Sequence, residues 1–66
     1  MQVTLNGESR HVRDGISVAE LINELSLNGR RLAVELNCAV LPRTNYEETA
    51  LAAGDVIEIV HFIGGG

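Results

Sequence analysis

Lysine and tryptophan are absent from this chain of 66 residues, which has one tyrosine, one phenylalanine and one cysteine. Its five positive charges are all arginines, and the formal net charge is −4. Proteins that bind nucleic acid present a basic surface, often with aromatic side chains on which bases stack. The composition therefore argues against nucleic acid as a partner, and an acidic surface favours protein partners with basic docking surfaces.

The single cysteine, Cys38, excludes an internal disulfide and provides no cluster of metal ligands. Its sequence neighbours offer no base or cation that would activate the thiol, so we expect a passive residue. No apolar run reaches the roughly 18 residues of a membrane-spanning helix, and no signal segment opens the chain. We expect a cytoplasmic protein without a membrane partner, in keeping with a free thiol.

Regular patterns fill the first half of the chain. Residues 1–6 alternate apolar and polar side chains, which predicts a half-buried strand, and Asn6-Gly7 predicts a hairpin to a return strand over 8–13. Ser17 and Glu20 have the spacing of a capping box at the start of a helix. An apolar stripe then predicts about three helical turns, ending at Asn28-Gly29. The stripe consists of Val18, Leu21, Ile22 and Leu25.

The second half of the chain predicts more strands. They are expected over residues 32–37, 40–41 and 56–63, with a single helical turn over 44–49. One helix among such strands indicates an α+β fold in which a mixed sheet packs on the helix. The helix provides a crossover long enough for a parallel strand pair, and the β-grasp arrangement satisfies this order. We expect one domain over 1–63 and a flexible glycine tail over 64–66.

The last predicted strand has two unlike faces. Ile57 and Ile59 share one face, which we expect to pack on the helix stripe. Glu58 places the other face toward solvent, and Val60 and Phe62 lie on that face near the end of the sequence. An exposed apolar pair there suits docking of a partner, with Glu58 beside it. The alternative is that Val60 and Phe62 pack against a neighbouring strand, since small apolar patches are common on monomers.

Gly64, Gly65 and Gly66 follow the last strand without a spacer. A segment without side chains is thin enough to thread a narrow channel and would present the α-carboxylate of Gly66 to an enzyme. A carboxylate is a poor electrophile until a leaving group such as AMP is attached. Because the chain has no phosphate-binding loop motif, a separate adenylating enzyme would have to attach it. The alternative is an inert, frayed end.

The other titratable residues are expected to have structural or surface roles. His11 and His61 lack the spaced partners of a metal site, although a docking contact is open to His61 because it lies near the tail. Glu20 and Glu24 are expected on the solvated side of the helix, and Glu47-Glu48 in a solvated turn.

Several segments, taken together in this order, resemble the ThiS family of ubiquitin-like β-grasp proteins, the sulfur carriers of thiamin-thiazole biosynthesis. They are residues 1–7, 18–22, 33–37, 40–43 and 54–60, with the ending Phe62-Ile63-Gly64-Gly65-Gly66. The resemblance covers nearly the whole chain. Two residues depart from it: Cys38 stands where the family more often has glycine or a polar residue, and Tyr46 where it often has tryptophan.

The resemblance implies a carrier rather than an enzyme, with no bound cofactor. An E1-like enzyme would use ATP and magnesium to adenylate the Gly66 carboxylate, and sulfur from a cysteine desulfurase would replace AMP to give a thiocarboxylate. Thiazole synthase would take this sulfur into the thiazole of thiamin, with Gly64 and Gly65 threading the partner's active site. Two alternatives stay open: another ubiquitin-like carrier, such as the small subunit of molybdopterin synthase, and an interaction module with an inert tail.

Overall fold

The computed structural model describes residues 1–62. The predicted end of the domain at residue 63 and the predicted tail over 64–66 lie outside the described residues. The elements are β1 (Gln2–Leu5), β2 (Glu8–His11), α1 (Val18–Glu24), β3 (Leu32–Leu36), β4 (Ala39–Leu41), the 3-10 turn η1 (Arg43–Asn45) and β5 (Val56–His61).

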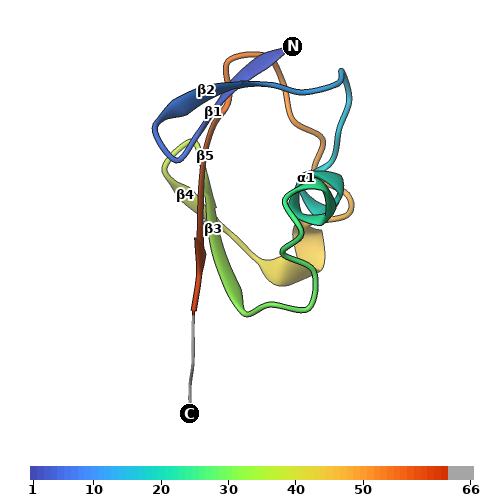
Figure 1. Cartoon of the computed structure of the whole chain (residues 1–66), viewed down its shortest axis with the longest axis vertical. Helices are drawn as coiled ribbons and strands as arrows, with labels where there is room; N and C mark the ends of the chain where they lie inside the picture. Colours follow the sequence, from blue (N-terminus) through green and yellow to red (C-terminus); the bar gives the residue numbers. More distant parts are fainter. Residues whose placement is uncertain (63–66) are drawn as a thin grey trace.

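The strands form one mixed sheet in the order β2-β1-β5-β3-β4. β1 pairs antiparallel with β2 and parallel with β5, while β3 lies antiparallel to both β5 and β4. Helix α1 lies on one side of this sheet (Figure 1). Helix α1 lies in the connection from β2 to β3, and the first and last strands form a parallel pair inside the sheet. This is the predicted β-grasp arrangement of an α+β fold, which is confirmed.

The first hairpin forms where the sequence predicts it. Asn6 and Gly7 have φ angles of 50° and 83°, the positive values that the tight hairpin turn requires at both central residues. The return strand ends at His11, two residues before the predicted limit. Val12 follows with its side chain in the core, where it is 3% exposed, and its N–H donates to the Met1 carbonyl.

Helix α1 begins as predicted but ends early. The Ser17 hydroxyl accepts a hydrogen bond from the Glu20 N–H at 3.0 Å, and the Glu20 carboxylate accepts one from the Ser17 N–H at 2.9 Å. The helix covers about two turns rather than three, so the predicted end at Asn28-Gly29 is wrong. The chain reverses instead at Ser26, whose φ is 60°.

A Schellman motif explains this early end. The Ser26 N–H donates to the Asn23 carbonyl, and the Leu27 N–H donates back to the Ile22 carbonyl at 3.1 Å. Leu27 packs against the core beside the end of the helix. This apolar contact lets a serine occupy the left-handed position that glycine usually fills.

The second half of the fold follows the predicted strands more closely than the predicted helical turn. β3 and β4 lie within one residue of their predicted limits and are joined by Asn37 and Cys38, both with positive φ. The helical turn predicted over 44–49 is wrong in position, since it covers Arg43–Asn45. It stops there because the chain turns toward α1, where the Thr49 carbonyl accepts from the Val18 N–H.

The core lies between the sheet and α1. The predicted helix stripe is confirmed, because Val18, Leu21 and Ile22 are buried and Leu25 is half-buried against them. The buried residues are Val3, Val12, Ile16, Val18, Leu21, Ile22, Val34, Leu51, Ile57 and Ile59. Each such side chain contributes about 1.5–3 kcal/mol on burial, so this small cluster positions the sheet. Within residues 1–62, no helix has the length and apolar character needed to cross a membrane.

Candidate functional site

Strand β5 divides its side chains between the core and the solvent. Ile57 is fully buried and Ile59 is 6% exposed, whereas Val60 and Phe62 are 55% and 57% exposed. Glu58 is exposed on the same side as Val60. The predicted assignment of the two faces is therefore confirmed, while the docking role of Glu58, Val60 and Phe62 stays a prediction.

These residues belong to a wider surface, which we call the outer sheet face. It comprises Ala33, Glu35, Val40, Val56, Glu58, Val60 and Phe62, placed on one side of the sheet by the strand register. None of the described elements covers this side, because α1 and η1 lie on the other (Figure 1). The face is open for a partner.

Packing against a neighbouring strand does not cover the apolar pair. Val60 is paired with Ala33 on β3, and an alanine methyl is too small to shield a valine. Val40 on β4, at 76% exposure, extends the apolar surface. Sequence reasoning missed Val40 as a surface residue, because its neighbour Leu41 points inward and only the β3–β4 register shows which of the two faces out.

Asn6 holds β5 close to its end. Its Nδ2 donates to the Ile59 carbonyl at 3.2 Å, and its Oδ1 accepts from the Ile59 N–H at 2.8 Å. β1 itself pairs with β5 only at Thr4 and Leu5, so the amide continues the strand pairing after β1 has ended. Sequence reasoning assigned Asn6 to the hairpin turn alone and missed this contact between residues 53 positions apart.

A second amide, Asn37, fixes where β5 begins. Its backbone N–H donates to the Val56 carbonyl, and its Oδ1 accepts from the Val56 N–H at 2.9 Å. Its Nδ2 donates to Asp55, whose other carboxylate oxygen accepts from the Ala52 N–H at 2.8 Å. At the far end, the Phe62 N–H donates to the Arg31 carbonyl at 3.0 Å. The strand that leads to the predicted tail is thus held from Val56 to Phe62.

The predicted reactive residues lie outside the described part of the chain. Gly64, Gly65 and Gly66 therefore remain sequence-based candidates. Among residues 1–62, no group of three or more histidine, cysteine, aspartate or glutamate side chains could hold a metal ion. Cys38 is exposed in the β3–β4 turn, and His61 is half-buried opposite Leu32.

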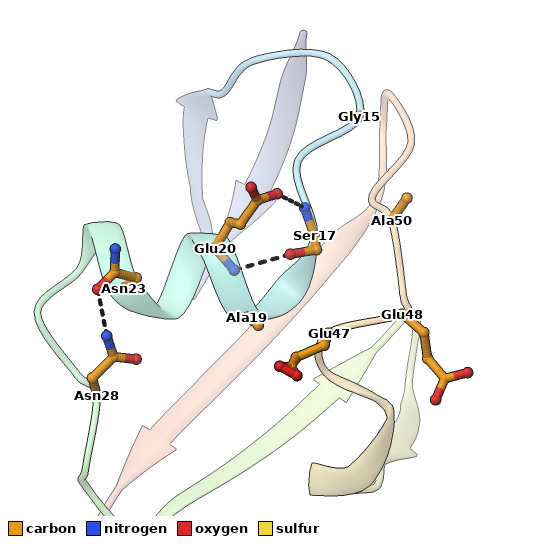
Figure 2. A pocket seen from close by; sticks show the side chains of 9 residues that line it. All are labelled: Gly15, Ser17, Ala19, Glu20, Asn23, Asn28, Glu47, Glu48 and Ala50. Atoms are coloured by element: carbon orange, nitrogen blue, oxygen red, sulfur yellow. Dashed lines mark hydrogen bonds between the residues drawn. The ribbon is translucent and has the colours of Figure 1, made fainter.

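A broad hollow lies on the helix side of the molecule, away from the outer sheet face (Figure 2). It is an open depression of about 560 Å³. Its lining residues are Gly15, Ser17, Ala19, Glu20, Asn23, Asn28, Glu47, Glu48 and Ala50. In Figure 2 the Glu47 side chain points toward α1 and that of Glu48 points away from it. Such a wide, polar depression lacks the apolar enclosure of a small-molecule site.

Glu20, in this depression, has a structural role. Hydrogen bonds from the backbone and side chain of Ser17 and the charge of Arg13 lower the pKa of Glu20. Arg13 also lies 2.7 Å from the Glu20 carboxylate and 3.4 Å from that of Glu24. Glu20 serves the start of α1, while Glu24 is its last residue. Both carboxylates are exposed, in agreement with their predicted place on the solvated side of the helix.

The fold and the sequence match one family of known proteins. The ThiS family model matches residues 3–66. The sulfur carrier protein ThiS of Bacillus subtilis is 36% identical over 63 residues, which cover 94% of this chain and 96% of that protein. The crystal structure of the thiamine biosynthesis protein ThiS from Geobacter metallireducens matches with a TM-score of 0.84 and 35% identity, over the whole of both chains.

Some relatives are much longer proteins. A thiazole synthase of Paramagnetospirillum magneticum is 41% identical over all 66 residues, and the chain spans 20% of its length. The chain spans the same share of a thiazole synthase of Magnetococcus marinus. The short and the long relatives share this 66-residue unit. The family model and the solved structure both identify the unit as ThiS. The chain belongs to the ThiS family.

Proposed function

We propose that this protein is a sulfur carrier of thiamin biosynthesis whose working group is the carboxylate of Gly66. The observation that carries the proposal is the extent of the family match, which runs from residue 3 to residue 66 and so includes the three glycines. The exposed outer sheet face, which leads along β5 toward these glycines, supports it. The protein acts as the substrate of other enzymes and supplies no catalytic side chain of its own.

The proposed chemistry takes place in two steps. An E1-like enzyme transfers AMP from ATP to the Gly66 carboxylate, with magnesium, and releases pyrophosphate. A sulfur nucleophile, derived from cysteine through a desulfurase, then displaces AMP and leaves a thiocarboxylate on Gly66. ATP and magnesium belong to the enzyme. The scheme requires a free α-carboxylate on Gly66 in the working protein.

The segment from Phe62 to Gly66 limits the distance between the docking surface and the adenylation site of the enzyme. Gly66 lies four positions after Phe62, and four residues of extended chain span at most about 14 Å. An enzyme that binds the outer sheet face at Phe62 must therefore hold its adenylation site within that distance. Glycines at Gly64 and Gly65 suit a narrow passage to the site, because they add no side chain to the width of the chain.

Thiazole synthase is the proposed acceptor of the sulfur. Two relatives named thiazole synthase contain the 66-residue unit within one longer chain. Joining a carrier to its acceptor raises the effective concentration of one at the other. We extend this pairing to the present protein, with thiazole synthase drawing sulfur from the Gly66 thiocarboxylate and restoring the carboxylate.

Intact-protein mass tests the proposal. After incubation with an E1-like enzyme, ATP, magnesium and a sulfur source, the protein should gain the mass of one exchange of oxygen for sulfur. A variant lacking Gly65 and Gly66 is the matched control and should gain nothing. An unchanged mass in the full chain would support an interaction module with an inert tail. Restoration of growth without thiamin, rather than without molybdopterin, would separate the two carrier functions.

A further inference from the structure

Two glutamates face each other across β3 and β5 on the outer sheet face. Glu35 and Glu58 are direct partners in the strand register, and both side chains are exposed. The Cβ atoms of such partners lie about 4.5–5.5 Å apart, and like charges at this spacing destabilise a sheet. The protein therefore carries an unfavourable pair of like charges on its outer sheet face.

No charge within the described residues offsets this pair. None of the ion pairs in residues 1–62 includes Glu35 or Glu58. The next residue across from Glu35 is Val40, and the next pair along the strands is Ala33 with Val60. Arg31 precedes Glu35 by four residues, about 13 Å along a strand. The two carboxylates thus stand within an apolar and uncharged frame.

Like charges directly opposite each other on neighbouring strands are unfavourable for folding, so their presence on an exposed surface points to a role in function. We propose that Glu35 and Glu58 together receive one arginine or lysine side chain of the adenylating enzyme when that enzyme docks on the outer sheet face. This inference rests on the proposed function, since it names the chemistry of the partner at the same docking surface. The net charge of −4 adds a long-range attraction toward a basic surface.

The surrounding apolar residues strengthen such a contact. When a partner covers Val40 and Val60, water leaves the space around the two carboxylates. A cation placed between them then interacts in a medium of lower dielectric constant, where charge pairs are stronger than at an open surface. The same cation removes the repulsion between Glu35 and Glu58. Docking therefore relieves a cost that the free protein bears.

The proposal makes two opposite predictions for the same substitutions. Glu35→Gln and Glu58→Gln should each raise the Kd for the adenylating enzyme about tenfold at low salt. Each should also raise the Tm of the free protein, because one member of the repelling pair is neutralised. High salt should weaken the wild-type complex more than either variant complex. Binding is measured by titration calorimetry and Tm by circular dichroism.

Glu47→Gln is the matched control, since it removes the same charge from the helix side of the molecule and should leave the Kd within about twofold. Wild-type affinity in Glu35→Gln and Glu58→Gln would overturn the inference, as would an equal loss in Glu47→Gln. Phe62→Asp separates this result from the proposed function. If Phe62→Asp weakens binding while the glutamate variants do not, the docking face stands and the cation contact is wrong. If none of these variants affects binding, both fail at this face.

Discussion

Asn6 has two structural roles, one in the first hairpin turn and one in binding strand β5. It adopts the positive φ of the hairpin turn, and its side chain holds both backbone groups of Ile59. Because the amide donates to a carbonyl and accepts from an N–H, an ionised carboxylate, which can only accept, does not reproduce both bonds. The residue thus connects the first turn of the chain with the last strand, β5.

Asn6→Asp tests this role with almost no change in shape. Aspartate tolerates positive φ, but its ionised side chain cannot donate to the Ile59 carbonyl. We expect a loss of about 1–3 kcal/mol in the free energy of unfolding at neutral pH, measured by urea denaturation. The loss should shrink in acid, where the protonated carboxyl can donate again. Asn45→Asp is the control, since Asn45 is exposed and its side-chain oxygen accepts from Thr44, a bond that aspartate keeps. Equal stability of the two variants would contradict the assignment.

Ser26 carries a conformational cost that glycine would remove. Its left-handed φ of 60° costs a non-glycine residue about 1–2 kcal/mol. Glycine would remove this cost, but its greater freedom in the unfolded chain would offset about 0.5–1 kcal/mol of the stability gained. Ser26→Gly should therefore raise stability by about 0.5–1 kcal/mol, visible as a higher Tm. Ser9→Gly, in an extended strand, should lower it. A lower Tm for Ser26→Gly would mean that the hydroxyl has a role the conformation does not explain.

At the scale of elements, the start of α1 is set by local chemistry and its end by packing. The hydrogen bonds of Ser17 and Glu20 involve residues three positions apart, so sequence spacing alone predicts them. The end depends on Leu27 reaching the core beside Ile22, which no local pattern reveals. This difference explains why the sequence predicted the first residue of the helix correctly and the last one wrongly.

The capping box also predicts a dependence on pH. The pKa of Glu20 is lowered from its ordinary value of 4.5, so the folded protein holds this carboxylate ionised more strongly than the unfolded chain does. Its stabilising contribution is complete above the unfolded pKa and is lost as the pH falls through the lowered, folded value. Glu20→Gln should therefore lose less stability on acidification than the wild type. Equal acid sensitivity in urea denaturation at several pH values would contradict this, with Glu48→Gln as control.

The candidate site shows the same limit of sequence reasoning. Alternation along one strand predicted that Val60 and Phe62 are exposed and that Ile57 and Ile59 are buried, since a strand's faces follow from its period. The contribution of Val40 and the pairing of Glu35 with Glu58 depend on register between strands. Register between distant strands is set by the whole fold, so these residues emerge only from the structure.

At the scale of the whole molecule, one face of the sheet packs on the core and no described element covers the other. The helix, the core and the hollow lie on one side, and the uncovered apolar face lies on the other. Substitutions on the open face should therefore affect partner binding without unfolding the protein. The large exposed apolar side chains there contribute little to the core; they are Val40, Val56, Val60 and Phe62.

Phe62→Asp tests this separation. The side chain is 57% exposed, so we expect the Tm to change by no more than a few degrees. Adenylation by the E1-like enzyme, measured as release of pyrophosphate, should fall at least tenfold, because a charge replaces an apolar contact in the proposed interface. Unchanged adenylation, or an unfolded variant, would count against the placement of Phe62 in the docking surface. Asn28→Asp adds the same charge in the hollow on the helix side and is the control for added charge.

The central claim is that Gly66 carries the transferred sulfur. The most direct measurement is the mass of the C-terminal peptide from protein isolated from cells that are synthesising thiamin. The proposed function predicts two forms of this peptide, a carboxylate and a form heavier by one exchange of oxygen for sulfur, with the difference located on Gly66 by fragmentation. A single carboxylate form under these conditions, or a sulfur located on Cys38, would contradict it.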